Sequence, residues 1–242
     1  MAKRTVLVIQ HAPWERAGRV GEALEDAGLD IETLSVVDVN KPELPKPGEL
    51  AGLVLMGGPM RADDYEHHPG LKAETKLVKE ATQAEVPVLG VCLGHQILAR
   101  ALGARLQPSD GMHQGMGTVK WVATDDAVST WANKTTPVLQ WHSDSASLPE
   151  GAKLLAKSAD TKVEAFRAGS ALGLQFHLEV TGPLFEQWLD MPQMVKGLKK
   201  RQIAELLEDF QAKDDLVQPL ADSIFSAFAA RCSTCAAQPV GE

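Results

Sequence analysis

The sequence has few aromatic residues, no long apolar run and no excess of positive charge. Aromatic side chains make up 5% of the 242 residues, too few for the stacking platforms that bind single-stranded nucleic acid. The formal net charge of -8 at pH 7 opposes binding to phosphate backbones. No segment approaches the roughly 18 consecutive apolar residues of a membrane span, and the run after Lys3-Arg4 is too short for a signal peptide. We therefore expect a cytoplasmic protein that binds neither nucleic acid nor a membrane.

Cysteine and metal-ligand clusters are also scarce. The three cysteines are an odd number, so they form no disulfide framework, and a cytosolic setting would keep them reduced. Cys232 and Cys235 have CxxC spacing near the C-terminus, but one such pair is half of a zinc site, and we interpret it as incidental. The histidines other than His177 have no cysteine or carboxylate at metal-ligand spacing. The sequence therefore predicts no metal and no cofactor, and it directs attention to cysteine chemistry.

The order of apolar segments in the first hundred residues predicts a doubly wound α/β fold. Short apolar, often β-branched runs alternate with segments of helical periodicity. The predicted strands cover residues 5–9, 31–36, 52–56 and 87–91, and the predicted helices cover residues 15–27 and 71–85. Buried strands that alternate with helices are typical of a largely parallel sheet with helices on both faces.

Beyond residue 105 the pattern changes to shorter segments in which polar and apolar residues alternate. These segments predict mixed or antiparallel strands added to the sheet, at residues 118–123, 138–142, 153–158, 163–167 and 171–177. Helices are predicted at residues 181–191 and 194–212, and a further packed helix around Phe225. We accordingly divide the chain into a main domain, residues 1–212, and a C-terminal helical extension and tail, residues 213–242.

The strongest chemical motif lies where the predicted strand 87–91 ends and a helix begins. Cys92 has a glycine two positions to either side, at Gly90 and Gly94. Small residues at these positions allow the sharp turn of a nucleophile elbow, which projects the central side chain from the sheet. The free N–H groups at the start of the next helix would favour the thiolate. On this spacing alone, a buried structural cysteine is the alternative.

A second motif follows the last predicted strand of the sheet. Gln175, His177 and Glu179 would share one face, because side chains alternate along a strand. A thiol nucleophile needs a base, and the base needs an acceptor that fixes its tautomer and stabilises its charge. Cys92, His177 and Glu179 complete that set. Taken alone, a histidine two residues before a glutamate is more often a surface pair.

Two glycines follow the predicted strand 52–56. The N–H group of Gly58 could pair with that of Leu93 to form an oxyanion hole, because two glycines allow the backbone to approach a ligand closely. An ordinary strand-ending turn is the alternative at this position.

These motifs, together with the WHSD run at residues 141–144, occur in the order and spacing of class I glutamine amidotransferase domains. Over residues 5–190 the chain resembles the glutaminase domain of GMP synthase and its free-standing relatives. The resemblance implies a flavodoxin-like fold with added strands. The chain departs from the family pattern at Leu178, where the family usually has proline, and at Met60, where it often has a small or polar residue.

The resemblance also implies the roles of individual residues. The implied triad and oxyanion hole comprise Cys92 as nucleophile, His177 as base, Glu179 as its orienting carboxylate, and the N–H groups of Gly58 and Leu93. The implied substrate-binding residues, which hold the α-amino and carboxylate ends of glutamine, are Gln96 and the backbone around Ser143 and Asp144.

Three functional hypotheses remain open on the sequence alone. The first is a glutaminase subunit that supplies ammonia to a separate synthetase or other acceptor subunit. The second is a self-contained hydrolase of a γ-glutamyl amide or peptide, and the third is an inactive binding or regulatory protein of the same fold. No Gly-rich phosphate loop is present, which places the acceptor chemistry elsewhere and favours the second hypothesis modestly. The complete Cys-His-Glu set argues against the third.

Overall fold

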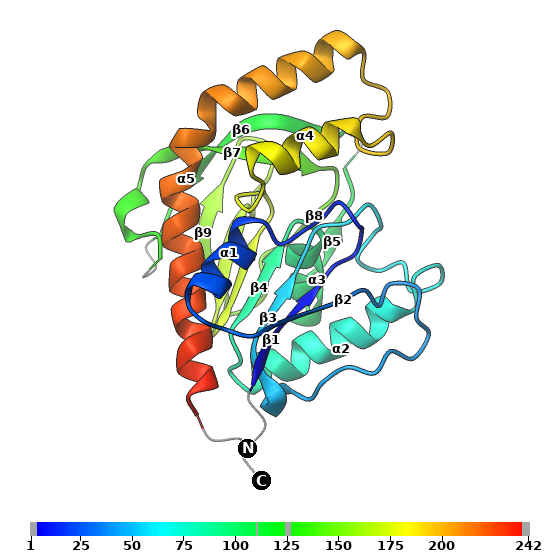
Figure 1. Ribbon diagram of the computed structural model, residues 1–242, viewed down its shortest axis with the longest axis vertical. Helices are drawn as coiled ribbons and strands as arrows, with labels where there is room; N and C mark the ends of the chain where they lie inside the picture. Colours follow the sequence, from blue (N-terminus) through cyan, green and yellow to red (C-terminus); the bar gives the residue numbers. More distant parts are fainter. Residues whose placement is uncertain (1–3, 110, 124–126, 239–242) are drawn as a thin grey trace.

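A computed structural model describes residues 4–109, 111–123 and 127–238, and a nine-stranded sheet runs through it (Figure 1). The strand order is β2-β1-β3-β4-β11-β10-β9-β6-β7. These strands are β1 (Thr5–Ile9), β2 (Ile31–Leu34), β3 (Leu50–Leu55), β4 (Val88–Val91), β6 (His113–Trp121), β7 (Thr135–His142), β9 (Lys153–Lys157), β10 (Ala165–Ala168) and β11 (Ala171–Leu174). A separate two-stranded ladder joins β5 (Leu106–Gln107) to β8 (Ser145–Ala146).

The first half of the sheet is parallel and confirms the predicted doubly wound α/β class. Strand β1 pairs in parallel with both β2 and β3, β3 pairs with β4, and β4 pairs with β11. The second half, from β11 through β10, β9 and β6 to β7, is antiparallel, which confirms the added antiparallel strands.

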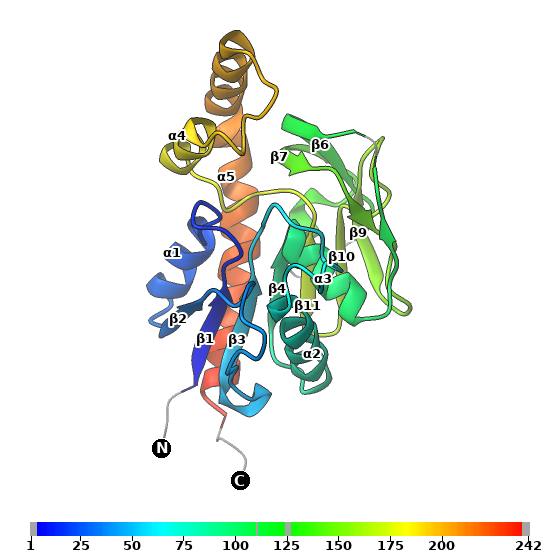
Figure 2. The same cartoon turned by 90° about the vertical axis from the view of Figure 1, so that its right-hand side faces the viewer.

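Helices cover both faces of the parallel strands (Figure 2). The helices of the described residues are α1 (Arg19–Asp26), α2 (Gly70–Gln83), α3 (Leu93–Ala101), α4 (Gly182–Asp190) and α5 (Lys200–Ala236), with 3₁₀ turns at Pro47–Glu49 and Ser129–Trp131, and α4 lies away from the parallel strands. Strand β1 shows how the sequence produces the two layers. Val6 and Val8 join the core cluster that includes α1 and α5, whereas Leu7 and Ile9 join the cluster formed with α2 and α3. This alternation is expected of a strand that is buried on both sides.

The C-terminal helix differs from the prediction. It begins at Lys200 rather than at residue 194, and it continues through residue 212 to Ala236 as one element. The predicted boundary between residues 1–212 and 213–242 falls inside this helix, and the end of the predicted tail, residues 239–242, lies outside the described residues. The prediction ended the helix at residue 212 because its apolar stripe ends at Phe210. Pro219 lies within the observed helix, where proline removes one hydrogen bond and favours a bend. Figure 1 shows α5 changing direction along its length.

The second half of α5 is part of the main core. Apolar residues from Val217 to Cys232 pack in the same cluster as Val6 and Val54 of the sheet. The CxxC pair therefore lies on a packed helix and not in a tail. A Cβ atom on Gly52 would lie 2.4 Å from the Cys232 sulfur, so β3 and α5 approach closely at this point.

A third apolar cluster lies at the β7 edge of the sheet, between β7 and the helices α4 and α5. It joins Trp141 of β7 to Phe185 and Trp188 of α4 and to Phe210 near the start of α5. Within the described residues, no helix combines the length and apolar character that crossing a bilayer requires.

Candidate active site

Cys92 occupies the turn between β4 and α3. Its backbone has φ 53° and ψ -105°, a conformation that residues other than glycine rarely adopt. The flanking glycines explain how the turn is packed: a Cβ atom on Gly94 would lie 2.1 Å from the carbonyl oxygen of Leu55, and one on Gly90 would lie 2.4 Å from that of Gly94. The Cys92 N–H donates to the carbonyl of Leu174 at 2.8 Å. This is the geometry of a nucleophile elbow.

His177 and Glu179 form a buried hydrogen-bonded pair. The His177 Nδ1 atom lies 2.6 Å from Oε1 of Glu179, and both side chains are 1% exposed. Burial lowers the pKa of His177, but the charges of Glu179 and Cys92 and the hydrogen bond to Glu179 outweigh it, so this pKa lies well above its usual value. The pair therefore favours an imidazolium beside Cys92.

The predicted strand beneath this pair is wrong in its extent. Strand β11 ends at Leu174, so Gln175, His177 and Glu179 do not lie on one strand face. Instead, the His177 N–H donates to the carbonyl of Leu139 on β7 at 2.8 Å. The bridge to β7 holds the segment in place after the β11 ladder ends, and His177 and Glu179 remain in contact.

Arg19, at the start of α1, holds the backbone around Glu179. Its guanidinium donates to the carbonyl of Leu178 at 3.1 Å and to the carbonyl of Val180. The backbone N–H of Arg19 donates to the carbonyl of Glu179 at 3.0 Å. The Nη2 atom of the guanidinium makes an ion pair with Asp214 of α5 and lies 2.8 Å from each carboxylate oxygen. Leu178 is itself buried in the main core.

The imidazole of His177 is also fixed from α4. The Trp188 ring packs edge-on against it, with centroids 5.0 Å apart and an angle of 89°. The Trp188 indole N–H in turn donates to the carbonyl of Trp14 at 2.8 Å. Contacts from both sides therefore restrict the rotation of His177.

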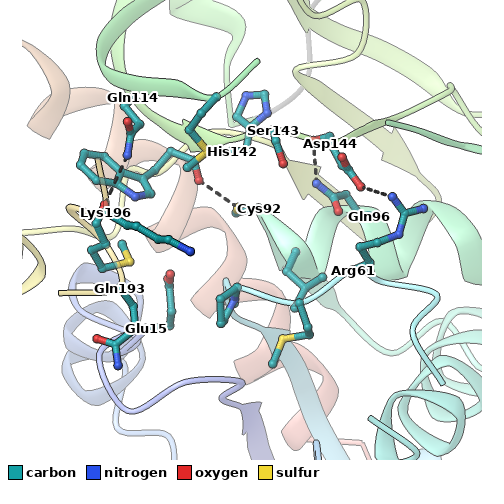
Figure 3. Close-up of a pocket in the computed structure, with 17 residues that line it drawn as sticks. Glu15, Arg61, Cys92, Gln96, Gln114, His142, Ser143, Asp144, Gln193 and Lys196 are labelled. Atoms are coloured by element: carbon teal, nitrogen blue, oxygen red, sulfur yellow. Dashed lines mark hydrogen bonds and ion pairs between the residues drawn. The ribbon is translucent and has the colours of Figure 1, made fainter. Parts of the chain in front are cut away.

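A cavity of about 530 Å³ opens beside Cys92 (Figure 3). Six of the site residues predicted from the sequence line it: Gly58, Cys92, Leu93, Gln96, Ser143 and Asp144. His177 and Glu179 are not among its lining residues and lie buried. The Cys92 thiol points to the carbonyl of Trp141 at 3.7 Å, which places the sulfur at the cavity wall.

Two backbone segments that carry candidate N–H donors meet beside Cys92. Leu93 is the first residue of α3, so no carbonyl within the helix can accept its N–H. A Cβ atom on Gly58 would lie 2.7 Å from both His11 Cβ and Leu93 Cδ2, which shows how closely the segment after β3 meets the start of α3.

His11 holds the segment that leads to Gly58. Its Nδ1 atom lies 2.9 Å from the carbonyl oxygen of Met56 and 3.2 Å from that of Gly57, and its Nε2 atom lies 3.0 Å from each carboxylate oxygen of Glu74. Burial lowers the pKa of His11, but the charge and hydrogen bond of Glu74 outweigh it and leave this pKa raised. A protonated His11 can donate to both sides at once.

The far end of the cavity is polar. Gln96 donates to the carbonyl of Asp144 at 2.8 Å and to Gln175 Oε1 at 3.3 Å. Arg61 donates to the Asp144 carboxylate at 3.0 Å (Figure 3). Ser143 is exposed beside them. This end therefore holds side chains of both charge signs together with backbone polar groups.

Glu15 belongs to the site but was not predicted from the sequence. It lines the cavity although only 5% of it is exposed, and burial raises its pKa to about 7. Ligand atoms of Glu15, His177 and Glu179 lie within 4.8 Å of one another, a grouping that could hold a metal ion, although Glu179 already bonds His177 through Oε1. The sequence pattern predicts a first helical turn at Glu15, so no local signal marks it.

The site thus places a thiol at a strand-to-helix elbow, next to a buried His-Glu pair, on a doubly wound α/β sheet. The family model described as class-I glutamine amidotransferase matches residues 19–189. The chain belongs to this family.

Individual relatives agree with this assignment. A crystal structure of a glutamine amidotransferase from Thermotoga maritima is similar, with a TM-score of 0.84 and 29% identity over 95% of this chain and 99% of that one. One of the chains named as a subunit of glutamine-hydrolyzing GMP synthase, from Methanococcus vannielii, is 25% identical over 178 residues, 73% of this chain and 88% of the relative. The glutamine-hydrolyzing GMP synthase of Thermomicrobium roseum is 35% identical over 130 residues, which span 53% of this chain and 23% of that longer protein.

Proposed function

We propose that the chain is a glutaminase subunit, which hydrolyses the side-chain amide of glutamine through Cys92, His177 and Glu179 and supplies ammonia to an acceptor. The observation that carries this proposal is the position of Cys92, which projects from the elbow into the 530 Å³ cavity beside the buried His177–Glu179 pair. Family membership supports the reaction class.

In the first half-reaction, the Cys92 thiolate attacks the amide carbon of the glutamine side chain and forms a carbon–sulfur bond. The amide oxygen becomes an oxyanion, and the N–H groups of Gly58 and Leu93 stabilise it. As the carbon–nitrogen bond breaks, the His177 imidazolium donates its proton to the departing nitrogen. Ammonia and a γ-glutamyl thioester result. Glu179 orients His177 and stabilises its charged form.

In the second half-reaction, a water molecule gives a proton to neutral His177 and adds to the thioester carbon. The carbon–sulfur bond breaks, which releases glutamate and restores the thiolate. Gln96, Ser143 and Asp144 are proposed to hold the charged end of glutamine throughout, with Arg61 fixing the Asp144 carboxylate at 3.0 Å.

In this proposal the ammonia passes to an acceptor. Relatives include a chain named as one subunit of GMP synthase, which supports a separate synthetase as the partner. A nucleophilic cysteine must stay reduced, which supports a cytoplasmic location, since the cytosol keeps thiols reduced.

The size of the cavity favours a second candidate function. Its volume of about 530 Å³ lies within the range of roughly 300 to 1,000 Å³ that holds drug-sized ligands, and glutamine is smaller than these. A self-contained hydrolase of a larger γ-glutamyl amide or peptide would use the same thioester chemistry and would need no partner.

Turnover by the purified chain separates the two candidates. We expect slow release of glutamate and ammonia in equal amounts from glutamine, no release by Cys92→Ala, and unchanged release by the matched control Cys235→Ala. Fast release from any γ-glutamyl peptide without a partner, at about 1 per second or more, would favour the self-contained hydrolase over the glutaminase that serves a partner. Undiminished release by Cys92→Ala would reject both.

A further inference from the structure

We infer that Glu15 is a positioning residue of the site, a second carboxylate that stabilises the protonated form of His177 from the side of the cavity. This inference rests on the function proposed above, in which the His177 proton takes part in the reaction. The charge interaction between Glu15 and His177 can itself be measured without substrate. Glu15 is separate from the Cys92, His177 and Glu179 set and comes from the loop between β1 and α1.

Glu15 is buried within reach of the His177–Glu179 pair. Ligand atoms of the three residues lie within 4.8 Å of one another, and Glu15 is 5% exposed. A Cβ atom on Gly57 would lie 2.4 Å from Glu15 Oε2, so the carboxyl packs closely on the segment that leads to Gly58. Within the described residues, Oε2 has no hydrogen-bond partner. Figure 3 shows the carboxyl directed into the cavity towards the region of Cys92.

Charges of opposite sign alternate around Glu15. The charges of His177, Glu179 and His11 act on it. His11 is bonded to the Glu74 carboxylate of α2, so the buried groups alternate in charge as Glu74, His11, Glu15, His177, Glu179.

Five further titratable or charged groups line the cavity with Glu15. They are the Cys92 thiol, the exposed Lys196 ammonium group, Arg61, Asp144 and the buried His142, whose pKa is lowered to about 4 chiefly by burial, with the charges of His113 and His177 acting in the same direction. The pKa of Glu15 reflects these surroundings: burial raises it to about 7, the charges of His177 and His11 act to lower it, and that of Glu179 acts to raise it. At neutral pH and above, the carboxylate form is therefore available.

The same interaction acts on His177. Because an electrostatic interaction is felt equally by both partners, the imidazolium that favours ionised Glu15 is itself favoured by it. A persistent imidazolium is what the departing nitrogen needs as its proton donor. A neutral amide in place of the carboxylate removes this contribution, and an opposite charge within about 4 to 6 Å shifts a pKa by roughly 1 unit or more.

The test is an NMR titration of imidazole-labelled protein, with the His177 signal assigned by its loss in His177→Ala. We expect the pKa of His177 to fall by about one unit in Glu15→Gln, and the basic limb of the pH profile of kcat/KM to move down by the same amount. Glu164→Gln is the matched control, because Glu164 is also a buried carboxyl with a pKa of about 7, yet its charged neighbour is Asp160 and not His177. It should leave the pKa of His177 unchanged.

An unchanged pKa of His177 in folded Glu15→Gln would overturn the inference, and so would an equal fall in Glu164→Gln. If Glu15→Gln does not fold, Glu15→Asp replaces it, and a shortened carboxylate should give a smaller fall in the same direction; no fall would again overturn the inference. The role of Glu15 and the proposed function can fail independently of each other. A lowered pKa without any glutamine hydrolysis by the wild type would reject the function alone, whereas hydrolysis with an unaltered pKa would reject the role of Glu15 alone.

Discussion

At the scale of single residues, the buried contact of 2.6 Å between His177 and Glu179 predicts that substitutions of Cys92, His177 and Glu179 reduce activity to different extents. Cys92→Ala and His177→Ala should abolish formation of the γ-glutamyl thioester, because they remove the nucleophile and the proton donor. Glu179→Gln should keep measurable activity, since an orienting group contributes less than the groups that it orients. Rapid quenching and intact-mass measurement of the thioester gives the order.

Two outcomes would contradict that order. Full activity in Glu179→Gln would place Glu179 outside the reaction, and complete loss in a folded Glu179→Gln would mean that orientation matters as much as the nucleophile. Cys235→Ala serves as the control for loss of a thiol, because Cys235 lies on α5 and bonds the carbonyl of Leu50.

The part of the candidate site that could be predicted is the part whose geometry depends on one short stretch of sequence. The spacing of Gly90 and Gly94 around Cys92 predicts the elbow, and the structure accounts for both glycines by close backbone contacts. Glu15 and Arg19 could not be predicted in this way. Each acts on the 177–180 segment from more than 150 positions earlier in the chain, and only the folded sheet brings them together.

At the scale of elements, the packing of α3 against β3 makes Gly94 a sensitive position. Gly94→Ala would place a Cβ atom 2.1 Å from the Leu55 carbonyl oxygen, so the start of α3 must move and carry the Leu93 N–H with it. We expect activity to fall about 100-fold or more, comparable to loss of one oxyanion-hole donor, together with a lower melting temperature. Gly21→Ala on α1 is the control.

That control should behave in the opposite way. A Cβ atom on Gly21 would meet the Ala17 side chain at 3.4 Å, an ordinary contact, and alanine in a helix is favoured over glycine by about 1 kcal/mol. Activity should be retained and the melting temperature should not fall. A fully active Gly94→Ala would show that the Leu93 N–H does not need its present position.

Element boundaries show where local patterns lose information. The parallel strands and their helices were predictable, because apolar residues on both faces of a strand leave a clear signature. The late strand was predicted too long because alternation continues past Leu174, whereas the ladder with β10 and β4 ends there. Helix α5 was divided at residue 212, where its first apolar stripe ends, although apolar residues from Val217 to Cys232 pack the rest of the helix on the sheet.

At the scale of the whole molecule, buried ionisable groups make stability depend on pH. Burial raises the pKa of Glu164 to about 7 from an ordinary 4.5. Below pH 4.5 both folded and unfolded chains hold this proton; between pH 4.5 and 7 only the folded chain holds it, so ionisation of the unfolded chain lowers stability as pH rises. Glu164→Gln removes this contribution, which is on the order of 3 kcal/mol at most.

Urea unfolding at pH 5 and pH 8 measures that contribution. The stability of Glu164→Gln relative to the wild type should rise from pH 5 to pH 8. For Glu150→Gln, at an exposed position, the difference in stability from the wild type should be the same at both pH values. A difference in stability between Glu164→Gln and the wild type that is the same at pH 5 and pH 8 would mean that the carboxylate is well solvated or paired in the folded state.

Covalent labelling tests most directly whether Cys92 attacks the side-chain amide of glutamine. The chain is incubated with 6-diazo-5-oxo-L-norleucine, an electrophile shaped like glutamine, and the modified peptide is located by mass spectrometry. Cys92 combines the start of α3 with the neighbouring His177–Glu179 pair, whereas Cys232 is buried against β3 and burial raises its pKa far above the usual range. We predict one label, on Cys92, prevented by excess glutamine. Labelling of Cys232 or Cys235 with Cys92 unmodified would contradict the role of Cys92 as nucleophile.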